Sequence, residues 1–108
     1  MLDAKDFGDD FLWGIATAAP QIEGAANGYG KGQSIWDTFA KRKGKVKKGH
    51  HPQIACDFYH HYKADLALVK LLGFNVFRFS IAWSRILPYG KGSVNQEGIA
   101  FYHRLIDE

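Results

Sequence analysis

Two segments of the chain are predominantly apolar on both faces, which is typical of strands covered on both sides. Residues 11–19 (FLWGIATAA) carry no charged side chain and end at Pro20. Residues 74–83 (FNVFRFSIAW) are rich in β-branched and aromatic side chains. Strands buried in a parallel sheet read as near-continuous apolar runs rather than as alternating ones. The pattern therefore predicts strands at 11–19 and 74–83, the second running into a loop.

The segment between these strands, residues 54–72, has the periodicity of an amphipathic helix. Tyr59, Tyr62, Leu66 and Val69 recur at steps of three and four residues. Gly73 follows directly as a C-terminal stop. A strand, a helix and a second strand in this order form a βαβ unit, whose crossover makes the strands parallel.

One further turn is predicted within this unit and one further helix after it. Ser34 is a suitable N-cap for a short amphipathic turn at 34–39, and Asn95 for a C-terminal helix with Ile99, Tyr102 and Ile106 on one stripe. Glycine-rich stretches at 27–32 and 88–93 predict loops. The expected order is β, loop, α, β, α, which is an α/β fold of two βα units in series.

Composition and cysteine content narrow the class of protein. The 108 residues are 46% hydrophobic and 15% aromatic, which is enough for a packed interior and argues against a disordered chain. No apolar run approaches the roughly 18 residues of a membrane span, and the acidic N-terminus does not resemble a signal peptide. Cys56 is the only cysteine, which excludes an internal disulfide and fits a reducing compartment. We expect a cytoplasmic protein with no membrane partner.

The net charge of +3 is concentrated in one short stretch. Six cations lie within eight positions: Lys41, Arg42, Lys43, Lys45, Lys47 and Lys48. Such a run could follow nucleic-acid phosphates, but Gly44 interrupts it, Gly49 ends it and no aromatic residue is interleaved to stack on bases. We interpret the stretch as a solvated loop that runs to about residue 53, and expect no nucleic-acid partner.

A metal site can be drawn from Cys56, His60 and the nearby His50 and His51. Metal sites need deprotonated ligands in a fixed geometry, and adjacent helical histidines point to different faces. We therefore expect no metal and no cofactor. His61 is interpreted as a packing or hydrogen-bonding residue of the helix.

The chain resembles family 1 of the glycoside hydrolases, the β-glucosidase family, over nearly its whole length. The matching segments, in the family's order, are 11–14 (FLWG), 16–18 (ATA), 21–24 (QIEG), 34–37 (SIWD), 57–59 (DFY), 61–65 (HYKAD), 78–81 (RFSI), Trp83 and 85–88 (RILP). Pro20 departs from the family, which usually has an aromatic residue or histidine before the glutamine. The resemblance implies a (β/α)8 TIM barrel, with residues 1–108 as the N-terminal fragment of a single domain and supplying about its first two βα units.

The resemblance also implies roles for Gln21 and Arg78, which fall where the two predicted strands end. Sites in such barrels lie at the C-terminal ends of the strands. The family uses the matching glutamine to hold sugar hydroxyls, which suits an amide that donates and accepts hydrogen bonds. It places the matching arginine beside the nucleophilic carboxylate, whose pKa a fixed cation lowers. The alternatives are a surface glutamine and an arginine paired with another acid of the barrel.

The implied activity is β-glycoside hydrolysis by the retaining, two-glutamate route, which needs carboxyl groups about 5–5.5 Å apart. In the family both glutamates are carried on later strands, so residues 1–108 hold no catalytic carboxylate. Glu23 is the one glutamate in a matched segment, and the family uses it in neither role. We expect the 108-residue chain alone to be inactive towards its β-glucoside or related small sugar.

The alternative is a non-catalytic chain that self-associates or complements the remainder of a barrel, which typically takes about 250 residues. Two parallel strands alone leave sheet edges unpaired and apolar faces open. Trp13, Trp36 and Trp83 could stack on sugar rings, but large aromatic side chains are more often found in the core, which is the expectation here.

Overall fold

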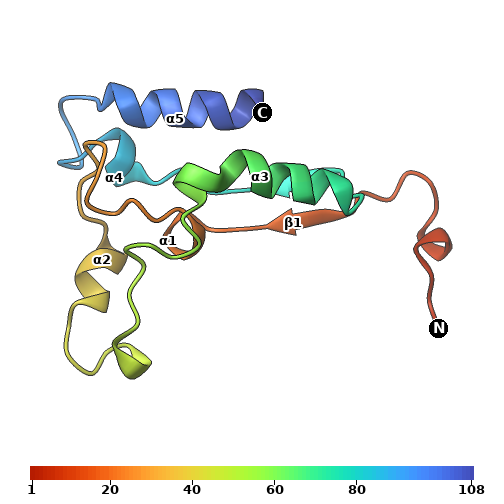
Figure 1. Cartoon of the computed structure of the whole chain (residues 1–108), viewed down its shortest axis with the longest axis horizontal. Coiled ribbons are helices and arrows are strands. Elements are labelled where there is room, and N and C mark those ends of the chain that lie inside the picture. Colours follow the sequence, from red (N-terminus) through yellow and green to blue (C-terminus); the bar gives the residue numbers. More distant parts are fainter.

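The computed structural model describes residues 1–108 as one parallel βα unit extended by helices and long loops (Figure 1). Strand β1 (Gly14–Ala16) pairs in parallel with β2 (Val76–Arg78), with Ile15 opposite Phe77. Helix α3 (Phe58–Leu71) connects them and lies beside the sheet in Figure 1. The predicted parallel βαβ unit is confirmed.

The other elements precede, connect or follow these three. They are a 3-10 turn at Ala4–Phe7, α1 (Ala19–Ile22), α2 (Ile35–Ala40), a 3-10 turn at Lys47–Gly49, α4 (Trp83–Ile86) and α5 (Gln96–Asp107). In Figure 1, α2 and the lysine-rich loop project from one end of the sheet, and α5 forms an outer layer. No helix is long and apolar enough to cross a membrane.

Both strands are shorter than the apolar pattern predicted. Residues 17–19 and 79–83 were expected to be extended, but each run turns into a short helix soon after its third paired residue. The Ala19 N–H donates to Ser80 Oγ at 2.8 Å, so the segment that follows β2 caps the helix that follows β1. Pro20 occupies the first turn of α1, where its missing N–H costs no hydrogen bond.

Helix α3 begins at Phe58 rather than at residue 54. Asp57, its N-cap residue, has φ +53, and its N–H donates to the Ile54 carbonyl at 2.8 Å, closing a separate turn before the helix. The predicted stop at Gly73 is confirmed: φ is +83, and the Gly73 and Phe74 N–H groups return to the carbonyls of Lys70 and Val69. These two bonds form a Schellman C-cap.

The Ser34 cap of α2 is confirmed by a reciprocal capping box. The Asp37 N–H donates to Ser34 Oγ at 3.2 Å, while the Ser34 N–H donates to Asp37 Oδ2 at 2.8 Å. Asn95 is the N-cap residue of α5, as predicted, but its side chain does not cap the helix. Its Nδ2 instead donates to the Tyr29 and Arg85 carbonyls, which ties α5 to two loops.

The apolar stripe predicted for α5 was wrong by one position. The buried residues are Gly98, Phe101, Tyr102 and Leu105, whereas Ile106 is 65% exposed. The physical reason is close contact at Gly98, where a Cβ would lie 2.2 Å from the Arg85 carbonyl oxygen. This approach turns the 98–101–102–105 face toward the protein.

An aromatic cluster between α3 and α5 forms the core. Phe58, Tyr59, Tyr62, Phe101, Tyr102 and Leu105 are buried together. Yet only 13 of the 108 residues are buried, and the accessible surface is 8055 Å². A compact protein of 12.1 kDa exposes about 6,000 Å². The chain therefore leaves roughly 2,000 Å² more surface in contact with solvent than its mass requires.

Candidate functional site

A buried ion pair joins the segment after β1 to the segment after β2. Arg85 Nε donates to Glu23 Oε2 at 2.9 Å, and the two side chains are 0% and 6% exposed. Arg85 Nη2 also donates to the Gly24 carbonyl at 3.1 Å. The two loops at this edge of the sheet are thus fixed to each other by charge-assisted hydrogen bonds.

Tyr102 of α5 completes this network. Its hydroxyl donates to Glu23 Oε1 at 2.5 Å and accepts from the Ala82 N–H at 2.7 Å. Burial, followed by the neighbouring Glu23 carboxylate, raises the pKa of the Tyr102 phenol far above its usual value of 10.0. The phenol therefore stays protonated, and donates to the Glu23 carboxylate, throughout the neutral pH range.

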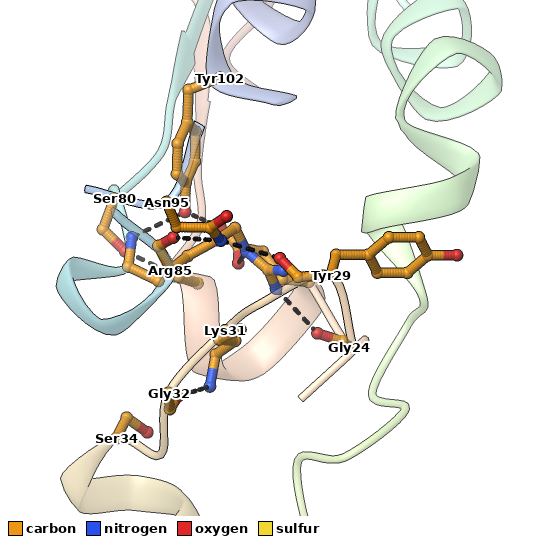
Figure 2. Close-up of polar contacts among 12 residues, drawn as sticks. Gly24, Tyr29, Lys31, Gly32, Ser34, Ser80, Arg85, Asn95 and Tyr102 are labelled. Atoms are coloured by element: carbon orange, nitrogen blue, oxygen red, sulfur yellow. Dashed lines mark hydrogen bonds and ion pairs between the residues drawn. The ribbon is translucent and has the colours of Figure 1, made fainter. Parts of the chain in front are cut away.

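Aromatic rings surround the Arg85 guanidinium. Its central carbon lies 4.6 Å from the Tyr59 ring centroid and 5.7 Å from that of Phe101. Cations are stabilised over aromatic faces, most strongly where water is excluded. In Figure 2, Arg85 lies between the Tyr102, Asn95 and Gly24 groups, with α5 above it. The cluster therefore joins the C-terminal end of α1 to α3, α4 and α5.

A second ion pair holds the loop that leads into α2. Lys31 Nζ lies 2.8 Å from Asp37 Oδ2, and the two side chains are 7% and 8% exposed. Burial pushes the pKa of Asp37 upward, but hydrogen bonds from Lys31 and Ser34 outweigh it, so the pKa lies below 3.8. This pair fixes α2 beside the loop at 27–32.

An open cleft of about 630 Å³ lies between these anchored loops. Its lining includes Pro20, Trp36, Ser80, Trp83 and Tyr89. Trp36 and Trp83 are 53% and 66% exposed, so the expectation that they belong to the core was wrong. Each presents an aromatic surface to the cleft because the helix that carries it, α2 or α4, lies on the cleft wall. Trp13 instead packs against Phe7 and Phe11, outside the cleft.

Gln21 lies in α1, directly beyond the carboxyl end of β1. Its side chain is exposed and lines a groove of about 370 Å³ together with Trp36, His50 and His51. Cys56 Sγ lies 3.9 Å from the Gln21 carbonyl oxygen, which is a weak contact. The Gln21 amide is thus available to a ligand that approaches this edge of the sheet.

Arg78 is the last residue of β2 and is also exposed. Phe77 packs toward α3, with its ring centroid 5.9 Å from that of Phe58, and side chains alternate along a strand. Arg78 therefore points to the opposite face, away from α3. It makes no side-chain hydrogen bond or ion pair in the chain and lines neither the cleft nor the Gln21 groove.

The remaining candidates are on the surface. No three His, Cys, Asp or Glu side chains are gathered as metal ligands would be. His61 is 62% exposed, with Nε2 3.6 Å from Asp57 Oδ2. The six cations of residues 41–48 lie in the projecting loop and are solvent-exposed.

The sequence reasoning missed the structural centre of this region, Arg85. The arginine and Glu23 belong to the RILP and QIEG segments that suggested the family, but periodicity could not pair them across 62 positions. The signal available was the charge of Arg85 inside an otherwise apolar segment, because a buried charge requires a partner.

Parallel βα units with polar residues at the carboxyl ends of their strands are the repeating unit of (β/α)-barrel proteins. The chain belongs to this class, and within it to glycosyl hydrolase family 1, whose family model matches residues 3–108.

Individual relatives agree with this assignment. The chain is 52% identical over 104 residues to the aryl-phospho-β-D-glucosidase BglC of Bacillus subtilis, covering 96% of the chain and 22% of the relative. It is 49% identical over 106 residues to β-glucosidase A of Thermotoga maritima, covering 98% and 24%. The chain therefore spans less than a quarter of the length of these relatives.

Solved structures show the same fold. The chain superposes on the T. maritima β-glucosidase in complex with castanospermine with a TM-score of 0.88 and 50% identity, covering 92% of the chain and 22% of that protein. A rice β-glucosidase mutant in a covalent complex with Glc gives a TM-score of 0.89 and 48% identity, covering 92% and 21%. The predicted membership of the (β/α)8 barrel fold is confirmed for its N-terminal part.

Proposed function

We propose that residues 1–108 form the N-terminal part of the sugar pocket of a single-domain β-glycosidase that acts by the retaining, two-glutamate mechanism. The observation that supports this is the position of Gln21 and Arg78. One follows β1 and the other ends β2, and the two strands run in parallel. In (β/α)8 enzymes the active site lies at this edge of the sheet.

In this proposal Gln21 binds the sugar and Arg78 tunes the nucleophile. The Gln21 amide donates and accepts hydrogen bonds with adjacent hydroxyls of the sugar ring. The Arg78 guanidinium, which has no acidic partner within residues 1–108, lies beside the nucleophilic glutamate carried elsewhere in the barrel and lowers its pKa. Neither catalytic glutamate is among residues 1–108, so this segment alone does not hydrolyse glycosides.

The proposed substrate is a β-glucoside with a small aglycone. Relatives named as β-glucosidase and as aryl-phospho-β-D-glucosidase match the chain at 49% and 52% identity. Because these identities are nearly equal, an aryl β-glucoside and its phosphorylated counterpart are both included in the test below.

A second candidate function is non-catalytic association, either with the remainder of a barrel or with a second copy of the chain. The exposed surface supports it, because an excess of roughly 2,000 Å² on one chain is enough for an obligate interface, which buries roughly 2,000–5,000 Å² summed over both partners. Its exposed apolar side chains include Leu68 and Leu71 on α3, Leu72 directly after α3, and Val76 on β2. The radius of gyration, 16.6 Å, also exceeds the about 13 Å of a compact chain of this length.

A barrel chimera tests the first proposal. Residues 1–108 replace the matched segment of T. maritima β-glucosidase A, which is 49% identical over 106 residues. We expect the chimera to hydrolyse an aryl β-glucoside or its phosphorylated counterpart, and the 108-residue chain alone to hydrolyse neither. A folded but inactive chimera would contradict the proposal, as would turnover by the chain alone.

Sedimentation tests the second candidate. We expect the 108-residue chain to be oligomeric, or to form a defined complex with the separately produced remainder of the T. maritima barrel. A monodisperse monomer that does not bind this remainder would overturn the association candidate.

We also propose a cytoplasmic location, supported by the single, unpaired Cys56. Cell fractionation of the native protein would check this location.

A further inference from the structure

Three polar side chains outside the proposed sugar pocket form a continuous hydrogen-bonded array. Tyr29 Oη lies 2.8 Å from His60 Nε2, and His60 Nδ1 lies 2.7 Å from Asp57 Oδ1. Tyr29 comes from the loop before α2, and the other two residues from the start of α3. A nucleophile, a base and a carboxylate that orients the base within hydrogen-bond reach are the elements of an activated nucleophile.

The Asp57 carboxylate determines which nitrogen of His60 carries the proton in this hydrogen-bonded array. An ionised carboxylate only accepts hydrogen bonds, so the contact with Asp57 requires a proton on His60 Nδ1. In the neutral imidazole, Nε2 then has a free lone pair and accepts the hydrogen bond of the Tyr29 hydroxyl. His60 is thus in the tautomer that can remove the phenolic proton.

The Tyr29 ring is held in place but remains accessible. It stacks on Tyr59 with a centroid distance of 4.5 Å and an interplanar angle of 27°. In Figure 2 the ring points away from the Arg85 cluster, toward the ribbon of α3. The Tyr29 residue is 42% exposed, so it lies at the surface, where an electrophile in solution can approach.

Tyr29 and Asp57, the first and last members of this hydrogen-bonded array, have an unusual backbone conformation. Tyr29 has φ +56 and Asp57 has φ +53, in the left-handed region that side-chain-bearing residues rarely adopt. The Tyr29 carbonyl is held by Asn95 Nδ2 at 2.8 Å, and the Asp57 N–H by the Ile54 carbonyl at 2.8 Å. Such conformations persist only where surrounding contacts enforce them, and they gather at functional sites.

We propose that Tyr29 is a nucleophilic modification site that takes an acyl group from an activated ester, with His60 as its general base. The Tyr29 oxygen attacks the ester carbonyl while its proton moves to His60 Nε2. The bond to the leaving alkoxide or aryloxide breaks, and this group leaves with the electron pair. An O-acyl-tyrosine forms, and His60 releases the proton to solvent.

The surroundings of His60 predict how this reactivity depends on pH. The groups that face it are Asp57 and the rings of Tyr29 and Tyr59. His61 acts on it only through Asp57, whose second oxygen lies 3.6 Å from His61 Nε2. Protonation of His60 at low pH fills the Nε2 lone pair, so acylation of Tyr29 falls as the pH is lowered.

The test is acetylation of the full 108-residue chain by p-nitrophenyl acetate, followed by peptide mass spectrometry. Tyr89 is the internal control, because it is 86% exposed and has no hydrogen-bonded base. If exposure alone governed reactivity, Tyr89 would react faster. We expect Tyr29 to react at least about tenfold faster than Tyr89. This threshold is below the roughly 10²–10⁴-fold that is typical of general-base catalysis. Equal rates would overturn the proposal.

Variants identify the base. In His60→Ala the preference for Tyr29 over Tyr89 should disappear. Asp57→Asn keeps a residue type that tolerates positive φ, and should change the pH profile at Tyr29 but not at Tyr89. Circular dichroism checks that each variant is folded. If a variant does not fold, the ratio of the Tyr29 and Tyr89 acylation rates in the wild-type protein still tests the proposal. A full preference for Tyr29 in folded His60→Ala would refute the role of the base.

Discussion

Glu23 and Arg85 form a desolvated ion pair between the two loops that follow the strands, with Nε and Oε2 2.9 Å apart. Glu23 lies two residues after Gln21, and Arg85 lies seven residues after Arg78. The pair therefore connects the segments that carry both proposed sugar-pocket residues. Both charges are shielded from solvent, so the contribution of each depends on the partner being present.

Arg85→Met should strongly destabilise the protein, because it leaves the Glu23 carboxylate buried with only Tyr102 to donate to it. Removing one member of a buried pair costs about 3–5 kcal/mol of unfolding free energy. Urea unfolding of the 108-residue chain measures this. Arg42→Met, at an exposed position, is the matched control and should stay within about 0.5 kcal/mol of wild type.

The double variant Glu23→Gln with Arg85→Met should recover part of that loss. It removes the unpaired charge, while the amide oxygen of the introduced glutamine can still accept a hydrogen bond from Tyr102. If the double variant were as unstable as the sum of two single variants, the ion-pair explanation would be wrong.

Tyr102→Phe should lower the unfolding free energy by about 1–3 kcal/mol at neutral pH, since Glu23 and the Ala82 N–H both lose a buried partner. The folded-state pKa of Tyr102 is raised, so its stabilisation is present below pH 10 and is lost as the pH rises toward the folded-state value. Wild type should therefore become less stable in alkali more steeply than Tyr102→Phe. Parallel alkaline slopes in urea titrations would contradict this.

Asp37→Asn should weaken the contact between the loop at 27–32 and α2. The pKa of Asp37 is lowered in the folded state, so the ionised carboxylate stabilises the protein above pH 3.8, and this contribution disappears as the pH falls through the folded-state value. We expect a loss of about 1–3 kcal/mol at neutral pH and a flatter acid limb in the variant. Asp10→Asn, which is exposed and forms no ion pair, is the control for a general charge effect.

Gly98→Ala should destabilise α5 although alanine is the better helix former by about 1 kcal/mol. The new Cβ would lie 2.2 Å from the Arg85 carbonyl oxygen, a backbone atom that cannot rotate away. Overpacking of this kind costs about 1–3 kcal/mol. Gly28→Ala has no atom within 4 Å of the added Cβ and should be nearly neutral in the same thermal unfolding measurement.

The barrel chimera separates the proposed roles of Gln21 and Arg78. Gln21→Ala should lower kcat/KM by about tenfold, the value of one or two neutral hydrogen bonds to the sugar. Arg78→Met should lower kcat and shift the acid limb of its pH profile upward, because the nucleophile loses a neighbouring cation. Gln96→Ala, at an exposed glutamine of α5, is the control for Gln21→Ala. Unchanged kinetics in both variants would remove these residues from the pocket.

The sequence by itself determined the order of the two strands and of the helices α3 and α5, the parallel arrangement of the strands and the family. Apolar runs, the 3.6-residue period of α3, Ser34 and Gly73 are local signals, and local backbone preferences act on them before any distant contact forms. Gln21 and Arg78 could be selected because they adjoin such runs in segments typical of the family.

Only the tertiary structure decided where each strand ends and which face of α5 is buried. Ser80 caps α1 from across the sheet, Gly98 brings α5 against Arg85, and Asn95 binds two loops instead of capping its own helix. The Glu23–Arg85–Tyr102 network and the Tyr29–His60–Asp57 array likewise join residues 3 to 79 positions apart. Periodicity carries no information about such partners, because their hydrogen bonds depend on positions in space that exist only once the chain has folded.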